Sequence, residues 1–325
     1  MTTDVMQNKS LLRSDTMRRV MAFAGLIIMF IAFSLASPNF LQFSNVVGIF
    51  IATAVNGVLV LGAYFVMIIA CIYLSVGIVM TFVAVLTGVF ITNLGLPIPI
   101  GILGGLLTGA LAGLVNGGAI AKMKIPPFVA TLGMLYIAKG LSLVISGLKP
   151  IYFNETPLFN KIMMGSIFPG FDIPNVILVF FGAALAAHII LTKTILGRYT
   201  FAIGSNEEAT RLSGVNVDFW KMAIYTLAGL FSGLAGVMIA GRLNSAQPAL
   251  GAGYELEAIA AVVIGGTSLS GGEGTILGTV IGAFIISTLT NGLRIMSIPQ
   301  EWQIVITGAI VILAVWVDIL RRRQQ

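Results

Sequence analysis

Long apolar segments alternate with short polar ones along most of the chain. A bilayer core of about 30 Å takes about 20 apolar residues in a helix, so each segment of that length predicts one membrane span. Cutting the sequence at polar loops and helix breakers gives ten predicted spans, at residues 18–37, 46–70, 74–94, 98–121, 127–147, 174–193, 219–241, 253–268, 273–293 and 301–320. The pattern therefore predicts an all-α polytopic membrane protein with about ten transmembrane helices.

The stretch from Val46 to Leu94 is harder to divide, because no charged residue interrupts it. Its polar groups are Asn56, Tyr64, Tyr73 and a few hydroxyl side chains. A re-entrant or broken helix near residues 70–76 is therefore an open alternative to two complete spans.

Basic residues predict how the spans are oriented, because cytoplasmic loops retain Lys and Arg. With a cytoplasmic N-terminus and ten spans, thirteen of the 18 basic residues fall on the cytoplasmic side, four fall outside, and Lys139 lies within a span. The predicted organisation is a cytoplasmic N-terminal tail at 1–17, a single transmembrane domain at 18–320 and a cytoplasmic C-terminal tail at 321–325. The two main loops are predicted to be cytoplasmic at 194–218 and extracytoplasmic at 148–173.

The predicted cytoplasmic loop carries charges of both signs and must lie in water. Ser205 or Asn206 can cap a short helix there, because their side chains accept hydrogen bonds from free backbone N–H groups. Glu207 and Glu208 then fall in the first turn, where the helix dipole favours negative charge. Gly214 suits the end of this helix, because glycine readily adopts the left-handed conformation.

Small residues recur at helical spacing on two predicted spans. Such strips let helix backbones approach closely in lipid, where association depends on van der Waals contact. They are interpreted as packing faces, formed by Gly105, Gly109, Gly113 and Gly117 on one span and by Gly274, Gly278 and Gly282 on another. The stretches 73–77 and 268–272 also look alike, which would fit two halves of like orientation.

The composition supports a membrane protein and argues against several other classes. Hydrophobic residues make up 58% and charged residues 9%, whereas soluble domains carry about 25% charged residues. The net charge of +6 forms no basic stripe, so no nucleic acid partner is expected. One cysteine, Cys71, and one histidine, His188, leave no disulfide framework and no multi-histidine metal site; both are expected to be packing or interfacial residues.

Catalytic and phosphate-binding motifs are missing from the sequence. The segment Leu269–Glu273 resembles the signature loop of ABC ATPases, and its glycines could open a dinucleotide loop, but they lie between two predicted spans and no GxxxxGK[ST] occurs. HExxH and GxSxG are missing too. The chain is therefore predicted not to be an enzyme, with no catalytic residue and no metal or cofactor of its own.

Ionisable residues are scarce inside the predicted spans, Lys139 being the chief exception. A proton- or sodium-driven carrier usually places such groups there, where they are costly unless used. Energy for transport is thus expected to come from elsewhere, and a self-sufficient channel or secondary carrier is the alternative. Glu255 and Glu257 are interpreted as the polar entry to the eighth span, because residues two apart lie on different helix faces.

Several stretches resemble the permeases of ribose-type ABC importers, and the likeness covers nearly the whole chain. Its most specific part is the loop, with Gly197-Arg198-Tyr199 followed by AIGSNEEATRLSGVNV at 202–217. Other similar stretches are SPNF at 37–40, SAQP at 245–248, GYEL at 253–256, AIAAVVIGGTSL at 258–269, GG at 271–272 and NGL at 291–293.

The resemblance implies a multi-pass permease subunit of the bacterial inner membrane that carries a monosaccharide. Its implied partners are a cytoplasmic ABC ATPase that binds ATP and Mg, an extracytoplasmic sugar-binding protein, and a second permease, identical or paralogous, within the lipid bilayer. In this family the loop forms a short coupling helix docked on the ATPase, here with Asn206, Glu207, Glu208, Ala209, Arg211 and Gly214. A permease for branched-chain amino acids or another small solute is the alternative.

One position departs from the family pattern. The family commonly reads Gly-Ile-Asp-Leu-Ser-Val-Gly-Ser, where this chain has CIYLSVGI at 71–78. Tyr73 therefore replaces an aspartate and adds an aromatic face. The hypothesis is that this subunit handles a different solute, or works beside a non-identical permease that retains the aspartate.

Polar groups near helix breaks are the expected contacts of a solute on its path through the membrane. The alternative for each is a hydrogen bond between helices. The candidates are Asn56, Tyr73, Ser75, Asn116, Thr267 and Ser268.

Overall fold

The computed structural model describes residues 20, 22–167 and 173–322 of the chain. The predicted tail at 1–17, residues 168–172 of the predicted 148–173 loop and the last three residues lie outside the described residues. After an apolar helix at Ala22–Ala36, the elements are α2 (Phe43–Ile68), α3 (Val76–Gly88), η1 (Val89–Asn93), α4 (Ile98–Ala121), α5 (Pro127–Ser146), β1 (Ile151–Tyr152), α6 (Pro157–Met164), α7 (Asn175–Lys193), α8 (Ile195–Ser205), α9 (Glu207–Leu212), α10 (Val217–Leu243), β2 (Ser245–Ala246), α11 (Tyr254–Ile264), α12 (Ile276–Ile295) and α13 (Gln300–Arg322).

Every predicted span overlaps one of these helices, but the helices differ in length. Within the described part of the chain, seven are long and apolar enough to cross a membrane: α2, α3 continued by η1, α4, α5, α7, α10 and α12. The helix at Ala22–Ala36 and the apolar part of α13 are shorter, and α11 has 11 residues. The prediction of an all-α polytopic membrane protein is confirmed, whereas the number of ten crossings stays a prediction.

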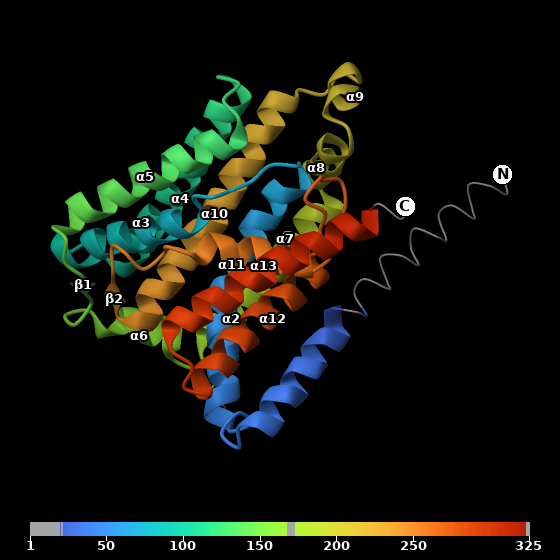
Figure 1. Ribbon diagram of the computed structural model, residues 1–325. Coiled ribbons are helices and arrows are strands. Elements are labelled where there is room, and N and C mark those ends of the chain that lie inside the picture. Colours follow the sequence, from blue (N-terminus) through green and yellow to red (C-terminus); the bar gives the residue numbers. More distant parts are fainter. Residues whose placement is uncertain (1–19, 21, 168–172, 323–325) are drawn as a thin grey trace.

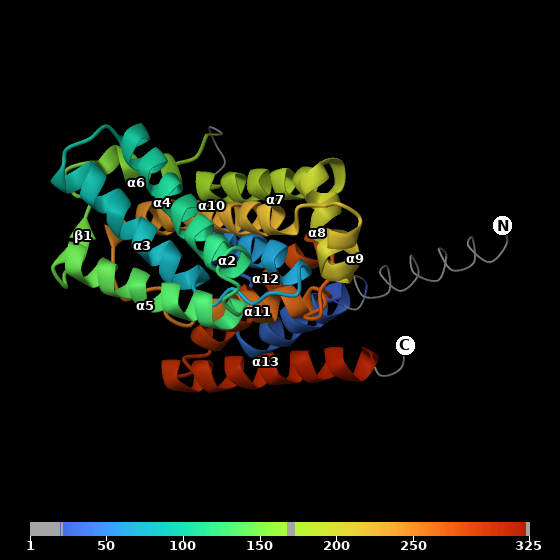
Figure 2. The same ribbon diagram turned by 90° about the horizontal axis from the view of Figure 1, so that it is seen from above.

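The 27-residue helix α10 lies at the centre of the bundle, in contact with α2, α3, α4 and α6 (Figure 1). Seen from above, α10 and α2 lie between α7 on one side and α13 on the other (Figure 2). Buried apolar residues of α2, α3 and α10 form most of one continuous core.

Glycine strips bring helices together, as the sequence predicted. A Cβ atom on Gly109 of α4 would overlap the Gly229 carbonyl oxygen of α10, and a Cβ on Gly113 would overlap the Tyr225 carbonyl oxygen. On α12, a Cβ on Gly282 would overlap the Ala261 carbonyl oxygen of α11. These contacts confirm both strips as packing faces.

Two helices begin inside the bundle. α2 ends at Ile68, Ala70 adopts a positive φ of 56°, and α3 begins only at Val76, so the chain is broken near residues 70–76. α11 likewise begins after an irregular segment, 247–253. The two starts meet, because a Cβ on Gly251 would overlap the Gly77 carbonyl oxygen. The irregular segment lies at the predicted boundary near residues 70–76, and α2 and α3 continued by η1 are each long enough to cross a membrane, so two complete spans and a broken helix both stay open. α11, with 11 residues, is shorter than the predicted span 253–268.

Basic segments predicted to lie in the cytoplasm gather at one end of the molecule. Lys124, which follows α4, pairs with Asp218 at the start of α10, next to α9. The hairpin of β1 and β2, in which Ile151 pairs with Ala246, lies with α6 at the opposite end (Figure 1). The grouping agrees with the predicted topology, and which end faces the cytoplasm stays a prediction.

Candidate functional site

The short helix α9 projects at one end of the bundle and begins with a side-chain cap. Asn206 Oδ1 accepts a hydrogen bond from the Ala209 backbone N–H at 2.9 Å. Of the two cap candidates in the sequence, the structure therefore selects Asn206 over Ser205. Glu207 and Glu208 occupy the first turn, and Gly214 follows the helix with a φ of 85°. Both ends of the helix thus use the predicted residues.

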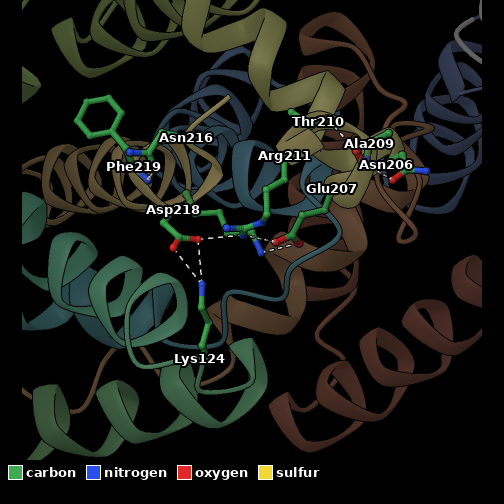
Figure 3. Close-up of polar contacts among 10 residues, drawn as sticks. Lys124, Asn206, Glu207, Ala209, Thr210, Arg211, Asn216, Asp218 and Phe219 are labelled. Carbon is green, nitrogen blue, oxygen red and sulfur yellow. Dashed lines mark hydrogen bonds and ion pairs between the residues drawn. The ribbon is translucent and has the colours of Figure 1, made fainter. Parts of the chain in front are cut away.

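A network of charged side chains ties α9 to the body of the protein (Figure 3). Arg211 donates to Glu207 at 3.3 Å, one turn earlier, and to Asp218 of α10 at 3.0 Å. Asp218 also accepts from Lys124 Nζ at 3.0 Å, and Glu207 accepts from Lys221 Nζ at 2.7 Å. Glu207 and Arg211 thus pair with the body of the protein while both side chains stay partly exposed. Their predicted role in docking stays a prediction.

The network shifts the pKa of two side chains of α9. Partial burial alone would raise the pKa of Glu207, but the hydrogen bonds and charges of Lys221 and Arg211 outweigh it, so the pKa lies below its ordinary value. The hydrogen bond to Asp218 and its charge raise the pKa of Arg211. Both groups are therefore ionised at neutral pH, and the short helix is held by charge-assisted hydrogen bonds.

The other side of α9 is free of these contacts and faces outward. Glu208 and Ala209 are exposed, and Leu212, one turn later, is 83% exposed. Residues three and four apart in a helix are neighbours on its surface, so these side chains form one face. Leu212 was not predicted as a site residue. The signal in the sequence is an apolar residue in a polar loop.

The end of α8, directly before α9, touches the end of α2 and the loop between α11 and α12 through the backbone of both segments. A Cβ on Gly204 would overlap the Ile68 carbonyl oxygen at the end of α2 and lie 2.6 Å from the Gly272 nitrogen. The Gly272 N–H donates to that same Ile68 carbonyl at 2.8 Å. Only glycine leaves room for this junction, and no local sequence pattern indicates which distant segments it joins.

Three candidate residues for the solute path come together beside the start of α3. Asn116 Nδ2 of α4 donates to Ser75 Oγ at 3.1 Å, and both side chains are buried. Tyr73 is 1% exposed and packs edge-on against Tyr225 of α10, with ring centroids 5.8 Å apart. The Tyr73 hydroxyl lies among Ser75, Asn116 and Ser232 without a hydrogen bond of ordinary geometry. The cluster joins α3, α4 and α10 inside one subunit.

Thr267 and Ser268 lie elsewhere, in the loop between α11 and α12. Ser268 Oγ accepts from the Ser270 N–H at 3.2 Å, which shapes the loop. Thr267 is fully buried, and a Cβ on Gly274 would lie 2.8 Å from its hydroxyl oxygen. This loop reaches the end of α2 through Gly272, so it belongs to the junction with α8.

The sixth candidate, Asn56, has a partner that sequence reasoning missed. Its Nδ2 donates to Glu257 Oε2 of α11 at 3.3 Å. Glu257 was interpreted as a polar entry to a span, because nothing in its local spacing identifies a residue 201 positions away as its partner. Cys71 is buried, as predicted for a packing residue, and His188 is exposed on α7.

Long apolar helices, two helices that begin inside the bundle after irregular segments and a charged helix at one end are the features of a polytopic membrane protein. Residues 45–315 match the family described as the permease component of branched-chain amino acid transport systems. The chain belongs to this family. The resemblance noted in the sequence is confirmed at the level of the permease family.

Known permeases of characterised systems are similar over nearly their whole length. The ribose import permease protein of Bacillus subtilis (strain 168) is 39% identical over 302 residues, which cover 93% of each chain. The ribose import permease protein of Escherichia coli (strain K12) is 36% identical over 98% of this chain and 99% of its own length. The xylose transport system permease protein of the same strain is 32% identical over 96% of this chain and 94% of its own length. No solved structure matches the chain.

Proposed function

We propose that the chain is the permease subunit of an ATP-driven ABC importer that carries a monosaccharide across the bacterial inner membrane. The observation that carries the proposal is α9, a short capped helix with an exposed outer face, in a chain whose sequence contains no phosphate-binding loop. The similarity to ribose and xylose permeases over more than nine tenths of the chain supports a sugar as solute. A branched-chain amino acid as solute is less well supported, because the similar permeases cited above are named for the sugars ribose and xylose.

The work of ATP hydrolysis enters through α9. A cytoplasmic ABC ATPase that binds ATP and Mg docks on Glu208, Ala209 and Leu212, and the inward network of Glu207 and Arg211 makes the helix move as one body with α10. The backbone junction at Gly204 then passes the movement to the ends of α2 and of the α11–α12 loop. Rearrangement of helices around these breaks opens the path alternately to each side.

Two further protein partners belong to this proposal. An extracytoplasmic sugar-binding protein delivers the solute at the end of the bundle that holds α6 and the hairpin. A second permease subunit, identical or paralogous, completes the path within the lipid. Tyr73 is buried against Tyr225 inside this subunit. Either the subunit handles a different solute, or a paralogous subunit supplies the aspartate of the family position. Purification of an active complex that holds only this permease would exclude the paralogous version.

Reconstitution tests the proposal directly. The permease, its ATPase and its binding protein are assembled in proteoliposomes, and uptake of D-ribose and D-xylose is measured with and without ATP. Uptake of a sugar that requires all three proteins is expected. Uptake that persists without the ATPase would instead identify a secondary carrier or channel.

A double variant tests the role of α9. Replacing Glu208 by Ala and Gly214 by Val removes an outward charge and places a β-branched residue at a positive φ, where it is strained. Loss of uptake and weaker ATPase association are expected, with normal membrane insertion. Normal uptake by this variant would contradict the coupling role.

A further inference from the structure

Glu257 is a carboxylate in the interior of a membrane protein. Its partner Asn56 lies at the centre of α2, a span of 26 residues, so the pair lies close to the midplane of the bilayer. Among the described residues, no cation lies within ion-pair distance of Glu257. Carboxylates at this depth are costly and are retained where they serve a function. None of the functional sites described above assigns such a function to Glu257.

The neighbouring carboxylate has a structural task that Glu257 lacks. Both carboxylate oxygens of Glu255 accept from the Gly253 N–H, at 3.1 and 3.2 Å, and so hold the turn that starts α11. Glu257 lies on another face of the helix and reaches across to α2. Glu255 therefore offers a matched control, two residues away in the same helix turn.

The start of α11 lies deep in the bundle. It touches the start of α3 at Gly77, and α3 then runs to Gly88, which packs against Ile151 and Ala246 of the hairpin. The start of α11 also carries Glu257, whose partner Asn56 lies at the centre of α2. Half-helices that begin at this depth surround the solute sites of many transporters. Glu257 is thus one turn into such a helix.

A small cavity adjoins Glu257. Asn56, Tyr254 and Glu257 border it together with Ala258, Ala261 and Ala283, and in this arrangement its walls are apolar. Its volume of about 10 Å³ is that of one water molecule, so a sugar fits only after α11 moves away from α2. Alanine walls permit such a movement with little loss of side-chain packing. Arg294 is near enough to act on Glu257 through space, and Arg242 on Tyr254.

We propose that Asn56, Tyr254 and Glu257 form a midplane binding site for an uncharged solute with several hydroxyl groups. The carboxylate accepts hydrogen bonds from two hydroxyls, and the Asn56 amide both donates and accepts. The ring of Tyr254 offers an apolar face for the C–H groups of the solute. In the closed arrangement the Asn56 amide occupies the position at Glu257 that a solute hydroxyl takes when the site opens. The assignment rests on the sugar permease function proposed above.

The test replaces one carboxylate at a time in the complete reconstituted transporter. Glu257→Gln keeps the size of the side chain, and Glu255→Gln is its control. Maximal uptake of D-ribose and D-xylose by Glu257→Gln is expected to fall at least tenfold, while ATPase activity stimulated by the binding protein stays within twofold of the original protein. Glu255→Gln is expected to stay within twofold in both measurements. Unchanged uptake by Glu257→Gln would overturn the assignment.

Deoxy sugars separate a solute contact from a structural role. One analogue lacks the hydroxyl that Glu257 binds. Uptake of this analogue by the original protein is expected to be reduced about as much as uptake of the complete sugar by Glu257→Gln. Uptake of the analogue by Glu257→Gln should be no lower than either. Equal loss on every analogue, together with loss of ATPase stimulation, would identify a structural role and overturn the site.

If the transporter that carries Glu257→Gln does not assemble, Glu257→Asp gives a second test, because it keeps the carboxylate and shortens the side chain. Glu257→Asp is expected to change the ratio of ribose to xylose uptake at least threefold, and an unchanged ratio overturns the site. Failure of the original protein to carry either sugar would instead refute the proposed function, so the two failures are distinguishable.

Discussion

Successive side chains of α9 point in different directions, because residues in a helix are about 100° apart. Glu207 and Arg211 are one turn apart and bind Lys221 and Asp218 of the body. Glu208 and Leu212, also one turn apart, face away from it. At the scale of residues, the helix thus divides into a face that fixes its own position and a face that is available to a partner.

Replacing Leu212 by Asp tests the outward face. Burial of a leucine at an interface contributes about 1.5–3 kcal/mol, so the dissociation constant of the ATPase from the solubilised permease is expected to rise at least tenfold. Leu158→Asp in α6, at the opposite end of the bundle and 59% exposed, is the control and should leave binding unchanged. Equal affinity for both variants would show that Leu212 lies outside the interface.

The inward face predicts a response to acid. The folded pKa of Glu207 lies below its ordinary value near 4.3, so its stabilising contribution is complete above that pH and is lost as the pH falls through the folded pKa. Because the side chain is 43% exposed, the contribution is at most about 1 kcal/mol. Amide exchange in residues 207–213, corrected for intrinsic rates, is expected to be constant from pH 8 to 6 and faster below about pH 4.5. Glu207→Gln should lack the acid-induced step, and a step of equal size in that variant would assign it to another group.

At the scale of elements, contacts between glycines decide how closely helices and loops approach. Gly204 meets the backbone of Ile68 and Gly272, and Gly109 meets that of Gly229 and Gly233. In contrast, a Cβ on Gly118 of α4 would meet no other described atom within 4 Å. Gly118 is therefore the control position for substitutions at Gly204 and Gly109.

Gly204→Ala is expected to separate ATP hydrolysis from transport. The added Cβ overlaps the backbone of Ile68, which cannot rotate away, so the junction must open. The variant should still bind the ATPase through α9, while sugar uptake falls at least tenfold and ATP hydrolysis no longer responds to the binding protein. Reconstituted uptake and hydrolysis measure both. Gly118→Ala should match the original protein, and coupled transport by Gly204→Ala would remove the junction from the mechanism.

Gly109→Ala is expected to weaken the packing of α4 on α10. Overpacking of a close contact costs about 1–3 kcal/mol, whereas Gly118→Ala gains helix propensity and fills open space. Thermal unfolding in detergent should therefore begin several degrees lower for Gly109→Ala and no lower for Gly118→Ala. Equal unfolding temperatures would mean that the helices tolerate a larger separation.

Signals that act over one helix turn were readable in the sequence. Asn206 and Gly214 mark the ends of α9, and a four-residue repeat marks the packing face of α4, because caps and small-residue strips depend only on neighbours in the chain. Contacts between distant segments were not readable. The hydrogen bond of Asn56 with Glu257 joins residues 201 positions apart, and no local pattern encodes it. For the same reason the short α11 was predicted as a complete span.

At the scale of the whole molecule, polar groups are distributed between two ends and a few internal breaks. The charged network of α9, Lys124 and Asp218 lies at one end, and the exposed residues Asn154 and Glu155 lie near the hairpin at the other. Between them, α4 and α5 expose apolar side chains such as Leu107 and Val144, as expected of surfaces in contact with lipid.

This polarity gives a test of orientation in the membrane. In the topology predicted from the sequence, thirteen of the 18 basic residues share the side of the 194–218 loop, which forms α9, and cytoplasmic loops retain basic residues, so the α9 end should face the cytoplasm. With the buried Cys71 replaced by Ala, single cysteines are introduced as Ser213→Cys at the α9 end and Asn154→Cys at the other. A membrane-impermeant maleimide should label Asn154→Cys in right-side-out vesicles and Ser213→Cys only in inside-out vesicles. The reverse pattern would place α9 beyond the reach of a cytoplasmic ATPase, and labelling of both residues from one side would contradict the arrangement of the two ends across a membrane.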